Sequence, residues 1–172
     1  MRPELKIENE KLKIEKKKPS IASLLEKSQR FIEDLSFSYV KDWKRRHPNQ
    51  LAIGYLPIYV PRPFLEALGI LPVALLGGGD QIDIIRGDSY FQSYICHIPR
   101  STIELGLSGA LDAFDGFIFP STCDVIRNLQ GMWQLLFPKC WSTYLDLPQD
   151  FEPITGGVFY RQQLCQMARE LV

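Results

Sequence analysis

Three short apolar segments, each closed by proline or glycine, constrain the fold of this chain most strongly. They are LAIGYL at 51–56, LPVALL at 71–76 and GFIF at 116–119. Strands that are apolar on both faces are typical of a parallel sheet that is covered on both sides. Segments with helical periodicity alternate with these strands. We therefore expect an α/β domain of flavodoxin-like or Rossmann-like type, with an open, mostly parallel sheet and helices on both faces.

The other elements follow from caps, breakers and periodicity. Serine and aspartate are favoured helix caps, so we expect Ser20, Ser101 and Asp124 to begin helices. A helix ends near His47, because the residue before a proline disfavours the α region. The expected helices cover 20–35, 39–47, 64–68, 101–111, 124–137 and 159–171, and a fourth strand covers 141–147.

The chain divides by composition into three parts. Residues 1–18 hold seven Lys or Arg and four Glu with few apolar side chains, so we expect a mobile basic tail. The alternative is an arm that docks on a partner subunit. Residues 19–47 are expected to form N-terminal helices, and residues 48–172 the α/β domain.

The net charge of the chain argues against nucleic acid as a partner. Twenty basic and twenty acidic residues cancel, so the usual signature of a nucleic-acid-binding protein is missing. No run of 18 apolar residues is present and residues 1–18 have no apolar core, so we expect no membrane contact, no secretory signal and a cytoplasmic protein. In that compartment cysteines are thiols or metal ligands rather than disulfides.

The segment at 77–100 is long for a strand-to-helix connection and begins with Gly77, Gly78 and Gly79. Long loops at the carboxyl ends of parallel strands commonly build ligand sites. The glycines suit a plain turn with positive φ, or a close approach of the backbone to a ligand. The turn at 57–61 has no glycine fingerprint, so dinucleotide binding is not expected, and no P-loop for ATP is present.

Two cysteines stand out because each precedes an expected helix at the carboxyl edge of the sheet. They are Cys96, in YICHIPR, and Cys123, in PSTCD. A helix N-terminus stabilises a thiolate, and thiolates ligate iron–sulfur clusters. The alternative is that both are small, half-buried side chains. For Cys140 and Cys165 we expect a structural role in the core.

The remaining polar candidates are less distinctive. His97 adjoins Cys96 and could hydrogen-bond to a cluster sulfur, or could be an ordinary loop residue. His47 is expected to be exposed and inert. Arg127, one turn into a helix, could face an anionic ligand or the solvent.

A larger pattern joins these pieces. The segments IGYLPIYVPRPFLEALGILPVALLGGG, YICHIPRSTIELGLSG and DGFIFPSTCDVIRNLQGMWQLLFP occur in this order. Together they resemble the benzoyl-CoA reductase / 2-hydroxyacyl-CoA dehydratase family over residues 38–172. The likeness is closer to the N-terminal part of a cluster-bearing subunit of ATP-dependent benzoyl-CoA reductase than to the dehydratases.

The resemblance implies a reaction and a set of partners. Two related subunits would pair, each with a 4Fe-4S cluster held by three cysteines, and an ATP-hydrolysing activator would supply low-potential electrons. The reaction implied is reduction of the ring of an aryl-CoA thioester. Within the family the alternative is a 2-hydroxyacyl-CoA dehydratase component. Outside it, the alternative is a non-catalytic α/β assembly module.

The resemblance also implies site residues. Cys96 and Cys123 match the first two cluster ligands, and the third is expected in a second α/β domain beyond this chain. The residues expected near the CoA substrate are Tyr59, Gly77, Gly78, Gly79 and His97.

Overall fold

The computed structural model describes residues 19–172, so the expected basic tail at 1–18 lies outside the described residues. Its sheet contains β1 (Ala52–Tyr55), β2 (Leu71–Ala74), β3 (Gly116–Pro120) and β4 (Trp141–Leu145). The strand order is β2-β1-β3-β4, and every neighbouring pair is parallel. The predicted α/β fold with a parallel sheet is therefore confirmed.

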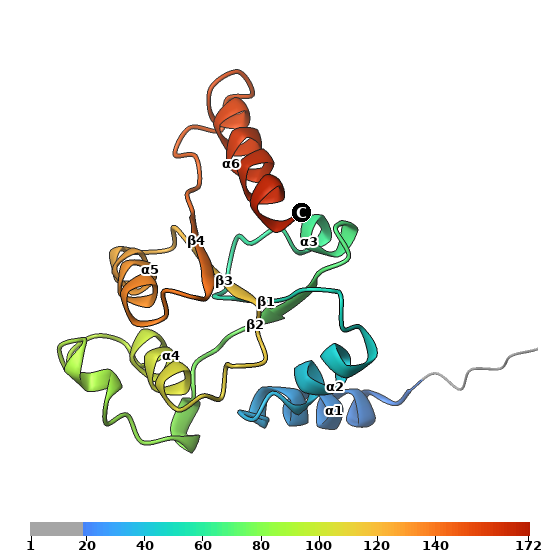
Figure 1. Cartoon of the computed structure of the whole chain (residues 1–172), viewed down its shortest axis with the longest axis vertical. Coiled ribbons are helices and arrows are strands. Elements are labelled where there is room, and N and C mark those ends of the chain that lie inside the picture. The colour runs from blue at the N-terminus through green and yellow to red at the C-terminus, as the bar shows by residue number, and fades with distance from the viewer. Residues whose placement is uncertain (1–18) are drawn as a thin grey trace, which may run out of the picture.

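Helices surround this sheet, as Figure 1 shows. One hydrophobic cluster joins the sheet to α2, α4 and α5, and a second joins it to α3 and α6. The sheet is thus covered on both faces, which explains why its two central strands, β1 and β3, are apolar and buried throughout. The helices are α1 (Ile21–Glu33), α2 (Ser38–Arg46), α3 (Arg62–Ala67), α4 (His97–Leu107), α5 (Asp124–Leu136) and α6 (Gly156–Leu171), with short 3-10 turns η1 (Gly79–Gln81) and η2 (Gly87–Ser89).

The larger cluster is built around Trp133 of α5, which is 1% exposed. Its ring centroid lies 4.7 Å from that of Phe117 on β3. On β1, a Cβ at Gly54 would stand 2.6 Å from the Phe117 ring, so only glycine fits beside that side chain. Strand β1 therefore carries a glycine at its centre because an aromatic ring of the neighbouring strand fills the space.

The N-terminal helices are held to the sheet through α2. Lys44 Nζ lies 2.7 Å from Asp115 Oδ2, and the same carboxylate accepts a 2.7 Å hydrogen bond from the amide of Ala52. This contact ties α2 to the starts of β1 and β3. Helix α1 begins at the expected cap, since Ser20 Oγ accepts from the amide of Ser23, yet none of its residues is buried.

Two predicted caps were wrong. Helix α4 begins at His97, one turn before Ser101, which lies inside it and is fully buried. Pro99 is tolerated in the first turn, where its missing N–H would have had no partner in the helix. Helix α5 has Cys123 as its N-cap, and Asp124 is its first helical residue rather than the cap.

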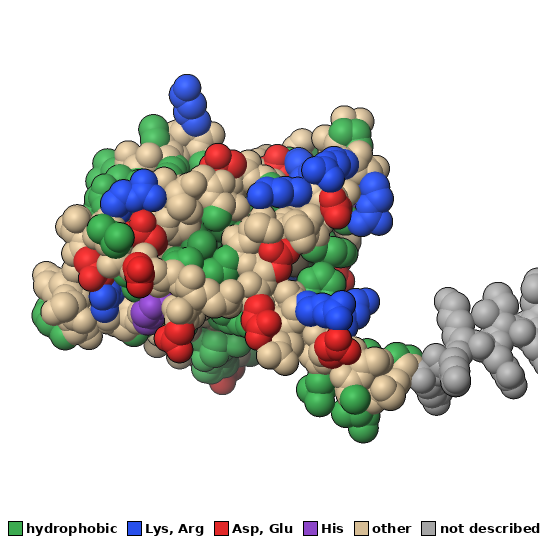
Figure 2. Space-filling view, turned by 90° about the horizontal axis from the view of Figure 1, so that it is seen from below, with side chains coloured by type: hydrophobic (Ala, Val, Ile, Leu, Met, Phe, Trp, Pro, Cys, Tyr) green, Lys and Arg blue, Asp and Glu red, His purple; other side chains and the backbone are tan. Residues whose placement is uncertain are grey.

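The surface mixes charge with apolar side chains. On the face drawn in Figure 2, acidic and basic side chains lie among one another with hydrophobic groups between them. Several large hydrophobic residues are well exposed, among them Tyr94, Phe151 and Ile154. In residues 19–172 no helix is both long and apolar enough to cross a membrane.

Candidate functional site

The two cysteines singled out from the sequence occupy equivalent positions in the fold. Cys96 is the N-cap residue of α4 and Cys123 is the N-cap residue of α5. Both are exposed, and neither thiol forms the side-chain bond of a normal cap. Helix α5 follows β3 after a short turn, so Cys123 lies at the carboxyl edge of the sheet. Their assignment as cluster ligands stays a prediction.

The glycine loop places the start of α4 at the same edge. Gly77 has φ +76°, and a Cβ there would collide with Ser101 Oγ and lie 3.2 Å from the Ile98 Cα. The amide of Gly78 donates a 3.0 Å hydrogen bond to Ser101 Oγ. The loop after β2 is thus packed directly onto the first turns of α4. At Gly77 the positive φ and this packing both require glycine, whereas Gly79, with φ +54°, faces open space.

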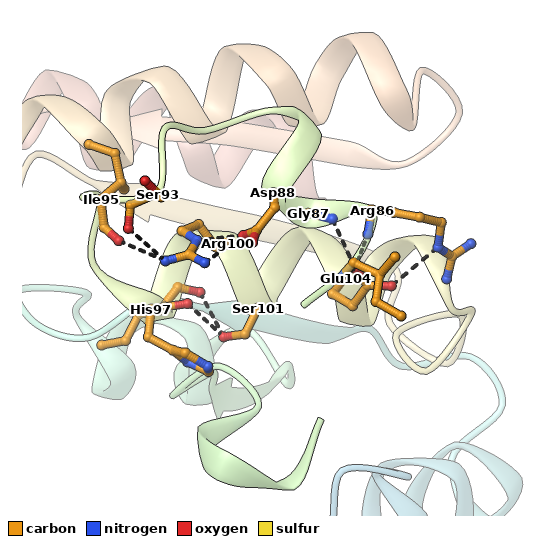
Figure 3. Close-up of polar contacts among 11 residues, drawn as sticks. Arg86, Gly87, Asp88, Ser93, Ile95, His97, Arg100, Ser101 and Glu104 are labelled. Carbon is orange, nitrogen blue, oxygen red and sulfur yellow. Dashed lines mark hydrogen bonds and ion pairs between the residues drawn. The ribbon is translucent and has the colours of Figure 1, made fainter. Parts of the chain in front are cut away.

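A buried carboxylate holds the next part of the long connection. Glu104 of α4 is 8% exposed, and its Oε2 accepts from the amides of Ile85, Arg86 and Gly87 at 2.7–3.0 Å. Figure 3 shows this arrangement. Burial by itself raises the pKa of Glu104, but these hydrogen bonds together with Arg86 Nε outweigh it and leave the pKa below its usual value. The segment is therefore fixed to α4 rather than free.

A second group of residues forms a hollow of about 460 Å³ between the loops that follow β1, β3 and β4. Tyr59, with φ +70° and 58% exposed, lines it. Ser121 and Thr122 contribute from the turn before Cys123, and Phe151 and Tyr160 from the β4–α6 region. Burial raises the pKa of Tyr160. A hollow of this size at the carboxyl edge of a parallel sheet suits a small-molecule group.

The predicted substrate residues are thus divided between two places. Gly77 and Gly78 pack on α4, near His97, which is exposed and begins that helix. Tyr59 lines the hollow instead. Sequence reasoning missed Phe151 and Tyr160, and the only signal for them was the pair of aromatic side chains on either side of the glycines that begin α6.

Of the two cysteines expected in the core, the structure buries only one in part. Cys140 is half-buried beside the larger cluster, as expected, and burial raises the pKa of its thiol. Cys165 is exposed, so its expected core role was wrong; Met167 is the buried residue at that end of α6.

His47 is not free in solvent, because its ring stacks on Trp43 with centroids 4.7 Å apart. Arg127 is exposed and lies over the ring of Tyr144.

The fit to a metal cofactor is partial. Cys96 and Cys123 offer exposed thiols of the kind that iron–sulfur clusters take as ligands. Within residues 19–172, no three His, Cys, Asp or Glu side chains gather as a metal site. A third ligand would therefore have to come from outside the part of the chain that the structure describes.

Comparison with known proteins shows the family of the chain. The family described as "2-hydroxyglutaryl-CoA dehydratase, D-component" matches residues 57–171. The chain belongs to this family. It is 47% identical to a benzoyl-CoA reductase subunit of Thauera aromatica over 152 residues, which is 88% of this chain. The predicted family resemblance is confirmed.

Two further relatives are dehydratase subunits. The chain is 36% identical over 67% of its length to the (R)-2-hydroxyglutaryl-CoA dehydratase beta subunit of Acidaminococcus fermentans. It is 27% identical over 66% of its length to the (R)-phenyllactyl-CoA dehydratase beta subunit of Clostridium sporogenes. The chain spans only 39%, 31% and 30% of the three relatives' own lengths. All three relatives are subunits of enzymes whose substrates are CoA thioesters.

Proposed function

We propose that the chain is the iron–sulfur subunit, or an N-terminal fragment of that subunit, of an ATP-dependent aryl-CoA reductase. The observation that carries the proposal is the 47% identity to the benzoyl-CoA reductase subunit, against 36% and 27% to the two dehydratase subunits. The reaction proposed is reduction of the ring of a benzoyl-CoA-type thioester by an oxidoreductase.

In this proposal Cys96 and Cys123 hold the cluster. Each stands at a helix N-terminus, where unpaired backbone N–H groups and the helix dipole favour negative charge. That environment supports thiolate ligands and the negative charge that accumulates on reduction. A bound 4Fe-4S cluster supplies single low-potential electrons. The third cysteine would come from beyond the described residues.

The hollow lined by Tyr59 and the exposed edge around His97 are the proposed surroundings of the aryl-CoA substrate. Thr122, which lines the hollow, directly precedes Cys123. A group bound there would therefore lie next to a cluster ligand, which is the arrangement that electron transfer to a substrate needs. The partners proposed are a related cluster-bearing subunit and an ATP-hydrolysing activator, in the cytoplasm.

The experiment that tests the reaction type uses the chain purified anaerobically with any subunits that accompany it. Benzoyl-CoA and, in a parallel assay, a 2-hydroxyacyl-CoA are supplied with ATP and a low-potential electron donor, and both thioester and donor are followed. The proposal predicts that the donor is consumed in fixed proportion to benzoyl-CoA. Conversion of a 2-hydroxyacyl-CoA to its enoyl-CoA, without net consumption of the donor, would overturn the reductase assignment.

That outcome would favour the second candidate, a component of a 2-hydroxyacyl-CoA dehydratase. The description of the matching family and the two dehydratase beta subunits among the relatives support it. Elimination of water leaves the oxidation level of the substrate unchanged overall, so electrons act only catalytically. The two candidates therefore differ in electron stoichiometry rather than in the fold.

A further inference from the structure

The side chain of Arg100 on α4 reaches back to the chain that leads into its own helix. Its Nη2 lies 2.6 Å from Asp88 Oδ1. Its Nη1 donates to the carbonyl oxygens of Ser93 and Ile95, at 3.1 and 3.3 Å. Figure 3 shows the guanidinium between these groups. The side chain of Arg100 is 16% exposed and that of Asp88 is 41% exposed, so the guanidinium is more shielded from water than its carboxylate partner.

The two carbonyl groups belong to the turn that ends at the N-cap. The amide of Ile95 donates a 3.0 Å hydrogen bond to the carbonyl of Gln92, and Cys96 is the next residue. Arg100 therefore binds one carbonyl inside this turn and one at its end. A planar guanidinium with several fixed donors can hold such a set of acceptors at once, and an ammonium group cannot do so with the same geometry.

The charge of Arg100 is a less important part of this arrangement. Asp88 lies within 2.6–2.7 Å of two guanidinium nitrogens and neutralises them locally. The contribution of the side chain to its surroundings is then the direction of its hydrogen bonds rather than its electrostatic field. What those hydrogen bonds fix is the peptide on the N-terminal side of Cys96.

The position of Cys96 depends on such hydrogen bonds, because no strand lies close before it in the chain. Cys123 follows β3 after two residues, so the strand itself sets its position. Cys96 comes at the end of the long connection from β2, which η1 and η2 interrupt but no strand supports. Glu104 holds the middle of this connection, and Arg100 holds its last turn.

We propose that Arg100 is a positioning residue, which fixes the backbone of the 92–95 turn so that Cys96 is held at the N-terminus of α4 before any cofactor binds. The proposal rests on the proposed role of Cys96 as a cluster ligand. Preorganisation of this kind lowers the ordering cost of ligation and depends on the shape of the side chain.

Hydrogen–deuterium exchange of the full chain tests the positioning directly. The variants are Arg100→Gln, Arg100→Lys and Asp88→Asn, with Arg45→Gln as the matched control. Arg45 forms an ion pair of similar length with Asp42, but on the exposed surface of α2, where its side chain holds no turn. Arg100→Gln is expected to speed exchange in residues 92–97 by about tenfold, because the turn loses two hydrogen bonds. Exchange around Cys123 stays unchanged.

The other variants separate geometry from charge. Arg100→Lys keeps the charge but is expected to recover less than half of the lost protection. Asp88→Asn keeps both carbonyl contacts and is expected to stay near wild type in residues 92–97. Unchanged exchange in Arg100→Gln, full protection in Arg100→Lys, or the same loss in Asp88→Asn would overturn the proposal. A uniform rise across the whole chain in Arg100→Gln would overturn it as well.

Iron content gives a second readout. In anaerobically reconstituted protein, Arg100→Gln is expected to retain less than half the iron per chain that Arg45→Gln retains. Equal iron in the two variants would overturn the proposal. If wild type itself holds no iron, the proposed function fails, and the exchange comparison still decides whether Arg100 fixes the turn.

Discussion

The backbone amide of Gly87 donates a 2.8 Å hydrogen bond to Oε2 of Glu104, a residue that is only 8% exposed. The same oxygen also accepts from two neighbouring amides. A Cβ at Gly87 would collide with the carbonyl of Arg100. Helix α4 thus acts as the support on which the long connection between β2 and Cys96 is folded.

The first prediction concerns this carboxylate and pH. Glu104→Gln is expected to lower the free energy of unfolding at pH 7 by about 1–3 kcal/mol, because one neutral oxygen replaces a charged acceptor of several donors. The pKa of Glu104 is lower in the folded chain than its usual value. Its stabilising contribution is therefore complete above that value and is lost as pH falls through the folded pKa.

Urea unfolding at pH 7 and at about pH 3 checks this sign. The difference in free energy of unfolding between wild type and Glu104→Gln should be large at neutral pH and should shrink in acid. A gap that stays constant with pH, or widens in acid, would show that the charged form of Glu104 is not what holds the loop.

A second prediction compares two glycines of one loop. Gly77 and Gly79 both have positive φ, but only Gly77 is crowded by Ser101 and Ile98. Gly79→Ala is expected to cost about 1 kcal/mol of stability, from backbone strain alone. Gly77→Ala is expected to cost about 2–4 kcal/mol, since strain and overpacking add. Thermal unfolding of both variants measures the difference, and equal losses would contradict the packing of this loop on α4.

A third prediction concerns which of the four thiols reacts most slowly. Burial raises the pKa of Cys140, whereas Cys96, Cys123 and Cys165 are exposed. Brief alkylation with iodoacetamide at pH 7, followed by peptide mass analysis, should therefore label Cys140 most slowly. Fast labelling of Cys140 relative to Cys165 would mean that β4 and α5 open readily around it.

The fold could be predicted from sequence because three of its strands are short apolar runs with clear proline or glycine ends. Each apolar run that ends in proline or glycine became a strand of the parallel sheet. The predicted ends of the strands were less accurate. Leu75 continues the apolar pattern and is 2% exposed, yet β2 stops at Ala74 because the ladder with β1 ends at Tyr55. Apolar periodicity reports burial, and hydrogen-bond pairing sets where the strand stops.

The candidate site could be predicted only in part. The helix signals at 101–111 and 124–137 placed Cys96 and Cys123 before helices, and the structure puts both at N-caps. The cap at Ser101 failed because that hydroxyl is used inside the fold, by the amide of Gly78. Contacts such as Glu104 with Gly87 join residues far apart along the chain by backbone amides, which every residue type except proline carries. No sequence pattern marks them.

The measurement that tests the central claim most directly is the iron and acid-labile sulfide content of the anaerobically purified, reconstituted chain with any accompanying subunits. Wild type is compared with Cys96→Ala, Cys123→Ala and Cys165→Ala, the last removing an exposed thiol away from the carboxyl edge. About four iron and four sulfide per cluster in wild type, lost in the first two variants and kept in the third, is the predicted result. No iron in wild type, or equal iron in all three variants, would contradict ligation by Cys96 and Cys123.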